Sequence, residues 1–389
     1  MAIGEMEAKL IKYLNYMKKV DGSDLHIKAT AIARGRVKGS LVKFGKSGFS
    51  KDGMDQLAQE ILTKAQYDEL VENRTLDFTF IIGKTGRYRG NMFYQLDGLS
   101  AVFRVIPLDI PSMKDLNLPP VLYEFTKVHR GLVLVTGVTG SGKSTTLAAI
   151  LNEINETRAD HLITVEDPIE FIHPDKMCLV NQRGVGQDAI SFGSALKGAL
   201  REDPDIILVG EMRDLETIEI GLHAASTGHL VFSTLHSINA KDTIDRMMGT
   251  FPPLEQPRIR KALSATLEGI VAQRLVKTLD GGRAAAIEIY KRTPRIEQLV
   301  AEGRDSEIAY ALAEGKETYG TQTFDQALLD IFYAGRMGME ALMENATSPS
   351  DVKLQLELNG YLDNKGEDGK PKGPEFFEFK EEPEEEEDE

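Results

Sequence analysis

Short apolar runs alternate with amphipathic stretches over the first third of the chain. In residues 5–19, Met6, Leu10, Leu14 and Met17 recur at helical spacing, which predicts an amphipathic helix with one buried face. Strand-like runs follow in residues 25–44, a helical segment in 53–73, and further strand-like runs in 76–83, 86–95 and 99–106. These patterns predict an N-terminal α+β domain over residues 1–110.

The pattern changes in residues 111–122, which contain three prolines and are typical of a linker. Beyond this segment, apolar strands without polar alternation are separated by helical stretches. The strands cover residues 131–137, 161–167, 205–211 and 228–236. Such strands with helical crossovers predict an α/β domain over residues 123–358, with a parallel sheet covered on both faces.

Composition limits the class of protein. Apolar residues make up 41% and charged residues 28% of the 389 positions, as in soluble globular proteins, and no apolar run approaches a membrane span. The single cysteine, Cys178, excludes an intrachain disulfide and a multi-cysteine zinc module.

The net charge of −15 is unevenly distributed. Residues 375–389 hold ten acidic residues and one lysine, or −9, so the rest of the chain carries −6. An acidic body argues against a broad nucleic-acid surface. Residues 359–389 are too polar to bury a core, which predicts a disordered acidic tail.

The stretch GLVLVTGVTGSGKSTT, residues 131–146, fits the phosphate-loop pattern G-x-x-x-x-G-K-[ST]. An apolar strand precedes it and a helical pattern follows, as this motif requires. Lys143 is expected to reach the β- and γ-phosphates and Ser144 to ligate Mg²⁺. The candidate phosphate-binding residues are Gly137, Thr139, Gly140, Ser141, Gly142, Lys143, Ser144 and Thr145.

Carboxylates follow two of the predicted strands. Glu211 ends the strand 205–211, where an open α/β sheet binds ligands, so it is a candidate for holding Mg²⁺ through water; the alternative is a surface residue capping the strand. Glu166, Asp167 and Glu170 follow the strand 161–167, where a carboxylate could orient the attacking water. We select Glu170 for that role, although the residues alone leave Glu166 and Glu170 nearly tied and a purely structural turn remains an alternative.

The stretch GHLVFSTLHS, residues 228–237, contains two histidines. If it is extended, His229 and His236 lie about 23 Å apart on opposite faces and cannot share a metal ion. His236 emerges at the ligand edge of the sheet, where it and Thr234 could hydrogen-bond the γ-phosphate. His229 lies at the other end and is more weakly supported.

Four segments, in this order, resemble the secretion-ATPase superfamily, and more closely the type IV pilus retraction ATPases of the PilT and PilU kind. They are GVTGSGKSTTLAAI, ITVEDPIEFIH, LREDPDIILVGEMRDLETI and TGHLVFSTLHS. The resemblance covers about residues 5–356. It implies a PAS-like N-terminal domain, a RecA-like ATPase domain, ATP and Mg²⁺ as cofactors, and a homohexamer with ATP bound between the two domains.

The resemblance also implies roles for single residues. Glu170 matches the catalytic glutamate and Glu211 the Walker B glutamate, while His229 and His236 fall on the two His-box histidines. Arg89 and Arg104 match N-terminal arginines that approach the phosphates when the domains close.

The expected function is pilus retraction at the cytoplasmic face of the inner membrane. Expected partners are the inner-membrane pilus platform protein and a paralogous pilus ATPase, with no nucleic acid. The segment RIEQLV, which carries Glu297, departs from the usual AIRNLI motif of retraction ATPases, and GTQTFDQAL is closer to PilU. Alternatives are a pilus-extension or type II secretion ATPase, an ATP-gated accessory adaptor, and a DNA-translocating ring.

Overall fold

The structure, a computed structural model, describes residues 3–37, 39–83, 86–106 and 109–361. It divides into two units, which are considered one at a time. The first unit comprises Met1–Ile110 with Glu170–Ile172, and the second comprises Pro111–Ile169 with His173–Glu389. Most of the predicted acidic tail, residues 362–389, lies outside the described residues.

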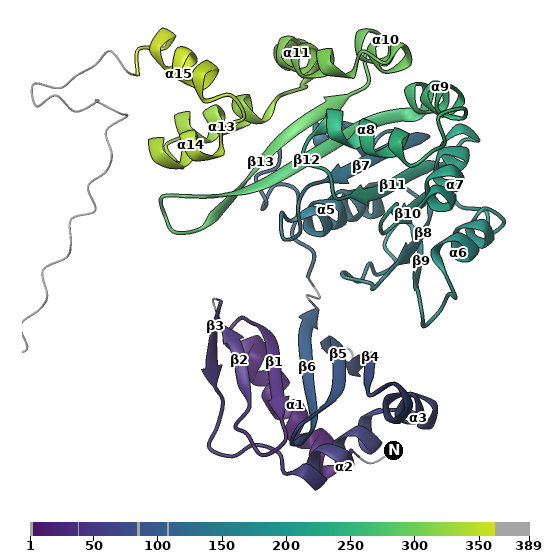
Figure 1. Ribbon diagram of the computed structural model, residues 1–389, viewed down its shortest axis with the longest axis vertical. Helices are drawn as coiled ribbons and strands as arrows, with labels where there is room; N and C mark the ends of the chain where they lie inside the picture. Colours follow the sequence, from purple (N-terminus) through teal and green to yellow (C-terminus); the bar gives the residue numbers. More distant parts are fainter. Residues whose placement is uncertain (1–2, 38, 84–85, 107–108, 362–389) are drawn as a thin grey trace, which may run out of the picture. The chain divides into compact units, whose positions relative to one another are not determined.

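The described part of the first unit is an antiparallel sheet with helices packed on it (Figure 1). The strand order is β3-β2-β1-β6-β5-β4. Its elements are α1 (Glu5–Lys19), β1 (Gly22–Lys28), β2 (Arg34–Val37), β3 (Ser40–Lys43), α2 (Lys51–Ile61), α3 (Lys64–Asn73), β4 (Thr75–Ile82), β5 (Gly86–Gln95) and β6 (Gly98–Ile106). Leu10, Leu14 and Met17 of α1 are buried in the core, while Met6 is partly buried beside it.

The helical segment expected at 53–73 is two helices. Leu62 is extended, and the Thr63 hydroxyl accepts a hydrogen bond from the Gln66 amide at 3.3 Å, so a capping box begins α3. The sequence T-K-A-Q contains this signal, because a threonine followed three residues later by glutamine is typical of a helix start.

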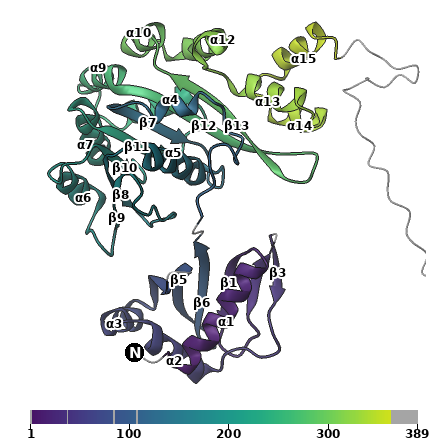
Figure 2. The ribbon, with the colours of Figure 1, turned by 180° about the vertical axis from the view of Figure 1, so that it is seen from behind.

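The second unit contains a seven-stranded sheet in the order β13-β12-β7-β11-β10-β8-β9 (Figure 2). Its strands are β7 (Gly131–Thr136), β8 (His161–Glu166), β9 (Leu179–Gly184), β10 (Ile206–Val209), β11 (Leu230–Leu235), β12 (Leu267–Lys277) and β13 (Arg283–Lys291). All neighbours are parallel except the pair β12–β13. The parallel sheet predicted from the apolar strands is therefore confirmed, with one antiparallel strand added at its edge.

Helices cover both faces of this sheet. The helices described in the second unit are α4 (Leu122–Phe125), α5 (Lys143–Thr157), α6 (Phe192–Ala199), α7 (Leu215–Ser226), α8 (Ala240–Gly249), α9 (Gln256–Thr266), α10 (Pro294–Glu302), α11 (Ile308–Glu314), α12 (Lys316–Tyr319), α13 (Phe324–Tyr333), α14 (Met339–Asn345) and α15 (Pro349–Leu358). Alternate side chains of β7 show why, because Leu132 and Leu134 join the core of α7–α9 while Val133 and Val135 join the core of α5. No helix in the described ranges is long and apolar enough to cross a membrane.

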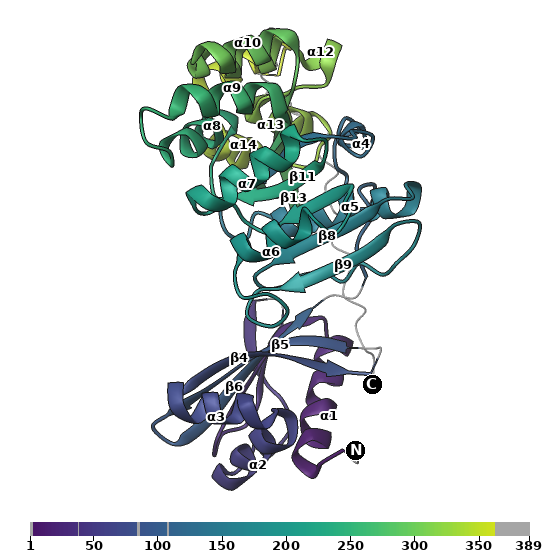
Figure 3. The same cartoon turned by 90° about the vertical axis from the view of Figure 1, so that its right-hand side faces the viewer.

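Three strands of this sheet, β9, β12 and β13, were not among the four that were expected. β9 forms the edge beside β8 (Figure 3), and its sequence LVNQRG, exposed or half-buried up to Arg183, lacks an apolar run. β12 follows α9 directly at Leu267, so no turn residues mark its start.

The segment predicted as a linker, residues 111–122, is packed into the second unit. Met113, Leu118 and Leu122 are buried in the same core cluster as α5, and the division of the chain falls after Ile110. The prolines led to the wrong prediction because the segment is irregular, but its apolar side chains still bury surface.

The predicted tail begins later than residue 359. The Tyr361 ring lies 5.0 Å from that of Tyr333 and 5.8 Å from that of Phe332. Asn359 donates from Nδ2 to the Tyr333 hydroxyl at 3.1 Å. Residues 359–361 therefore belong to the C-terminal helices, which corrects the predicted boundary.

Candidate functional site

The phosphate loop connects β7 to α5 and depends on glycine at three positions. Gly137, Gly140 and Gly142 have φ values of 147°, 79° and 88°, which glycine adopts without steric cost. A Cβ atom on Gly137 would also lie 2.4 Å from the Gln273 carbonyl oxygen. The loop therefore leads into the N-terminus of α5, where backbone amides and the helix dipole favour an anion.

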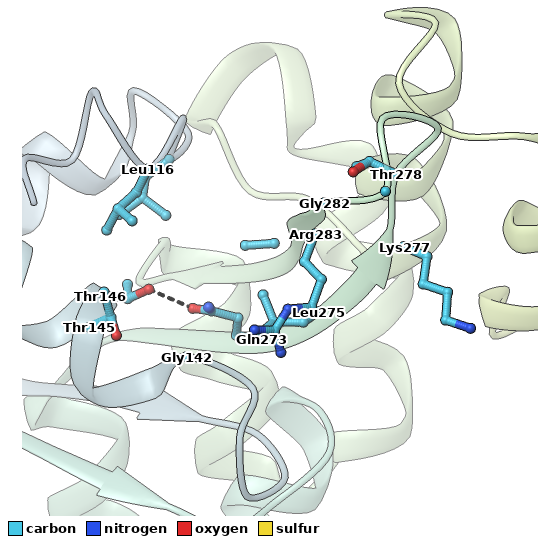
Figure 4. Close-up of a pocket in the computed structure, with 13 residues that line it drawn as sticks. Leu116, Gly142, Thr145, Thr146, Gln273, Leu275, Lys277, Thr278, Gly282 and Arg283 are labelled. Carbon is cyan, nitrogen blue, oxygen red and sulfur yellow. Dashed lines mark hydrogen bonds between the residues drawn. The ribbon is translucent and has the colours of Figure 1, made fainter. Parts of the chain in front are cut away.

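Gln273 of β12 holds this loop in place and was not predicted. Its Nε2 donates to the Ser141 carbonyl at 2.7 Å, and its Oε1 accepts from the Thr146 hydroxyl at 2.7 Å (Figure 4). The side chain is buried, so both bonds are shielded from water. A lone glutamine within the apolar stretch 267–277 is the signal that could have identified it.

The Lys143 ammonium group is buried at the mouth of the loop. It donates to the carbonyl oxygens of Gly137 at 2.8 Å and Val138 at 3.1 Å, and lies 3.4 Å from Nδ1 of His236. The positive charge is thus fixed against the loop that would hold the phosphates.

His236 lies between Lys143 and Glu211. Its Nε2 is 3.5 Å from Oε2 of Glu211, which is also 2.7 Å from the Arg213 guanidinium. Because an ammonium group only donates, Nδ1 of His236 is the acceptor toward Lys143 and the proton sits on Nε2, facing Glu211. These side chains meet because the carboxyl ends of β7, β10 and β11 share one edge of the sheet.

Thr234 fixes the strand ends rather than facing outward. Its hydroxyl donates to the Gly210 carbonyl at 2.7 Å, and its own carbonyl accepts from the Met212 amide at 3.2 Å. The hydroxyl proton is therefore used within the protein, and Thr234 positions Glu211 from both sides. Ser144 and Thr145, in the first turn of α5, are half-buried, and Thr139 of the loop is exposed.

The two candidate bases have different surroundings. Glu166 is buried at the end of β8, and its Oε1 accepts from the Thr164 hydroxyl at 2.8 Å and from Gln182 at 3.2 Å. Glu170 is exposed and lies in the short segment Glu170–Ile172 that groups with the first unit.

His229 lies at the opposite end of β11 from His236. Its Nδ1 is 3.0 Å from the Ala224 carbonyl at the end of α7, and its own carbonyl accepts from the Gly131 amide at 3.0 Å. Gly131 is the first residue of β7, and the phosphate loop follows the last residue of that strand. The full length of β11 separates His229 from the loop, as the spacing predicted, and its part in nucleotide binding stays a prediction.

Arg89 and Arg104 lie directly opposite each other on β5 and β6 of the first unit. Arg104 donates from Nε to Oδ1 of Asp24 at 2.8 Å, while Arg89 is 3.9 Å from Oδ1 of Asp77. Burial tends to raise the pKa of Asp24, but hydrogen bonds from Ser23 and Arg104 outweigh it and lower that pKa. Both guanidinium groups are more than two-fifths exposed and available to a further anion.

A pocket of about 780 Å³ opens beside the phosphate loop (Figure 4). Its walls come from the segment after Ile110, from the start of α5, and from the β12–β13 hairpin. They include the apolar Leu116, Leu118, Leu275 and Ala285, the loop residues Gly142, Thr145 and Thr146, and the polar Thr278 and Arg283. This volume lies in the usual range for small-molecule sites.

Comparison with known proteins identifies the family. The family described as type II/IV secretion system protein matches residues 106–352, which hold the phosphate loop, Glu170, Glu211 and His236. The chain belongs to this family.

Individual relatives define the group within the family. This secretion ATPase is 43% identical to the type IV pilus retraction ATPase PilT of Pseudomonas aeruginosa, over 88% of this chain and 99% of that protein. It is 37% identical to the type IV pilus ATPase PilU of the same organism, over 90% and 92%. A solved structure of the pilus retraction motor PilT with bound ADP has a TM-score of 0.83 and 40% identity, over 89% of this chain and 99% of that one. The chain is therefore a secretion ATPase of the PilT/PilU type.

Proposed function

We propose that this secretion ATPase is an ATP-hydrolysing motor that powers type IV pilus retraction. The observation that carries the proposal is the Lys143–His236–Glu211 array, which joins the phosphate loop to the Walker B strand. Support for retraction comes from the names of PilT and PilU, which align over most of the chain.

The residues present fit a magnesium-bound nucleotide. Phosphates would contact the loop amides and Lys143, with the Ser144 hydroxyl and Glu211, through water, holding Mg²⁺. The nucleotide base would enter the 780 Å³ pocket, between Leu116 and Leu275. Bound Mg²⁺ would neutralise charge that develops on the phosphate oxygens.

Hydrolysis requires a group that accepts the proton of the attacking water. We assign this role to Glu170, because the Glu166 carboxylate already accepts two hydrogen bonds within its own sheet. Lys143 would exchange the carbonyls of Gly137 and Val138 for phosphate oxygens. His236, in contact distance of both Lys143 and Glu211, would then respond to the presence of the terminal phosphate.

The remaining features complete the proposal for the whole assembly. The first unit is the PAS-like domain, whose Arg89 and Arg104 would approach the phosphates on domain closure. The chain would work as a homohexamer at the cytoplasmic face of the inner membrane, against the pilus platform protein. A paralogous pilus ATPase is a further expected partner.

Replacing Lys143 by alanine tests the site and the function together. The purified Lys143→Ala protein should keep its fold but lose ATP turnover, because the loop then lacks the charge that aligns the phosphates. Lys114→Ala, an exposed lysine outside the site, is the matched control.

Fluorescently labelled pili distinguish the motor classes in cells. Cells carrying only Lys143→Ala should display excess pili that no longer shorten. Bald cells would instead indicate an extension or type II secretion ATPase. Normal retraction without turnover in the purified wild-type protein would indicate an accessory adaptor.

A further inference from the structure

A buried glutamate lies at the junction of two helices in the second unit. Glu288 of β13 is 7% exposed, and its Oε1 accepts a hydrogen bond from the Ala240 amide at 2.7 Å. It also accepts one from the backbone of Phe324. Ala240 is the first residue of α8 and Phe324 the first residue of α13, so one carboxylate holds two helix N-termini. Both ends carry partial positive charge, which favours an anion between them.

The start of α8 is tied to His236. Arg246 of α8 donates to the His236 carbonyl at 2.7 Å, and the Ser237 hydroxyl lies 2.7 Å from that of Thr243. Asn239 accepts from the Asp242 amide at 2.7 Å and caps the helix. The loop between His236 and Ala240 is therefore bonded at both ends to α8, and a shift of His236 would move the helix start.

The start of α13 leads into the C-terminal helices. The Asp325 carboxylate accepts from the Ser348 amide at 2.8 Å, just before α15. The Arg274 guanidinium carbon lies 3.9 Å from the Phe324 ring centroid. Side chains of α13, α14 and α15 share one core with the β12–β13 hairpin. A shift at Phe324 would thus displace side chains that pack against all three helices.

The buried charge has a cost that packing alone does not explain. Burial raises the pKa of Glu288 to about 7, against the hydrogen bonds from Ala240 and Phe324 and the nearby Arg274, which lower it. An apolar side chain of similar size would fill the space without this penalty. What an apolar side chain could not supply is a shared acceptor for two helices.

We propose that Glu288 is a positioning residue that couples the His236 loop to helices α13–α15. Binding of nucleotide at the phosphate loop would reach the C-terminal helices through α8 and this carboxylate. The inference rests on the proposed function only in that a nucleotide binds beside His236.

Hydrogen–deuterium exchange of the full chain, with and without magnesium AMP-PNP, measures this coupling. In the wild-type protein the nucleotide should slow amide exchange at the starts of both α8 and α13. In Glu288→Gln the response of α8 should persist, while that of α13 should fall by about fivefold, within the usual range for coupled sites. The ATPase KM should change little, because the contacts of the phosphate loop remain. The kcat should fall, because the coupling to α13 is weakened.

Two further variants separate coupling from stability. Ala240→Pro removes the amide donor of α8 at a position where proline suits a helix, and should weaken the α13 response in the same way. Glu268→Gln changes a half-buried glutamate of β12 that pairs with Arg292 at 3.1 Å, and should leave the response unchanged.

The outcomes are distinguishable. Undiminished nucleotide response of α13 in both Glu288→Gln and Ala240→Pro overturns the coupling. A wild-type protein that binds AMP-PNP without any change at α13 also overturns it. If AMP-PNP does not raise the unfolding temperature of the wild-type protein, no nucleotide has bound, and the proposed function fails instead.

Discussion

His236 lies between two groups of opposite charge, the Lys143 ammonium and the Glu211 carboxylate. Its ring lies 3.4 Å from the Lys143 ammonium and 3.5 Å from the Glu211 carboxylate. Loss of the terminal phosphate would return Lys143 to its carbonyl acceptors and change what Nδ1 of His236 faces. A neutral histidine is suited to this, because its two nitrogens act as one acceptor and one donor.

The choice between the two candidate bases can be tested at single residues. Glu170→Gln should retain nucleotide binding and slow turnover by about 10²-fold, the scale of a positioned general base. Glu166→Gln should act more weakly on turnover, since its Oε1 position continues to accept from Thr164 and Gln182. Steady-state ATPase rates and nucleotide affinity of both variants decide the matter, and an inactive Glu166→Gln beside an active Glu170→Gln would reverse our assignment.

Glu288 also gives the protein a pH-dependent stability. Its pKa is raised from the usual 4.5 to about 7 in the folded state, so the stability that this group contributes is fully present below pH 4.5 and is lost as the pH rises through 7. The loss is at most about 3 kcal/mol, from the size of the shift. The facing charges are Arg274 of β12 and Asp325 of α13.

Urea unfolding at pH 5, 6, 7 and 8 measures this contribution. Burial lowers the pKa of His173 to about 4, which acts in the opposite sense on acidification, so wild type must be compared with Glu288→Gln. The difference in unfolding free energy between the two should change across this range, whereas that for the exposed Glu340→Gln should stay constant. A constant difference for Glu288→Gln would contradict the prediction.

At the scale of elements, the sequence predicts most strands of the first unit and the central strands of the second. Runs such as 76–83 and 131–137 show the periodicity of a one-sided or fully buried strand, so the prediction follows from the pattern. β12 is missed because it begins where α9 ends, and Gln273 because its partners lie 127 and 132 residues away. The seven-residue spacing in an extended run places His229 and His236 at opposite ends of one strand, and β11 lies between them.

Two variants in the segment 111–122 test whether it is packed into the second unit or is an unpacked linker. Leu118→Ala should lower the stability of the second unit by about 2–4 kcal/mol, as expected for a buried leucine that leaves a cavity. Lys114→Ala, which is exposed in the same segment, should have little effect. Chemical unfolding of both variants separates the possibilities, and equal stabilities would mean that the segment is an unpacked linker after all.

At the scale of the whole molecule, the chain divides into two units after Ile110, and the buried Met113 already belongs to the second unit. The segment Glu170–Ile172 also groups with the first unit. Our proposal requires the chain at this division to permit closure of the first unit onto a bound nucleotide. The arginine pair on β5 and β6 is where such closure would have its chemical effect.

Arg104→Ala and Arg89→Ala test this closure. Two like charges directly opposite on adjacent strands repel each other, so an anion between them would be favoured. If that anion is the terminal phosphate, each variant should lower kcat by at least about tenfold, because arginines that stabilise transferred phosphoryl groups contribute this much or more. The KM for ATP should change less, since the contact forms mainly in the closed state.

Asp24→Asn is the matched control, because it removes the 2.8 Å ion pair of Arg104 and keeps the arginine. If turnover is as low in Asp24→Asn as in Arg104→Ala, the ion pair matters for the fold of the first unit. If turnover is unchanged in both arginine variants, the first unit is a passive scaffold.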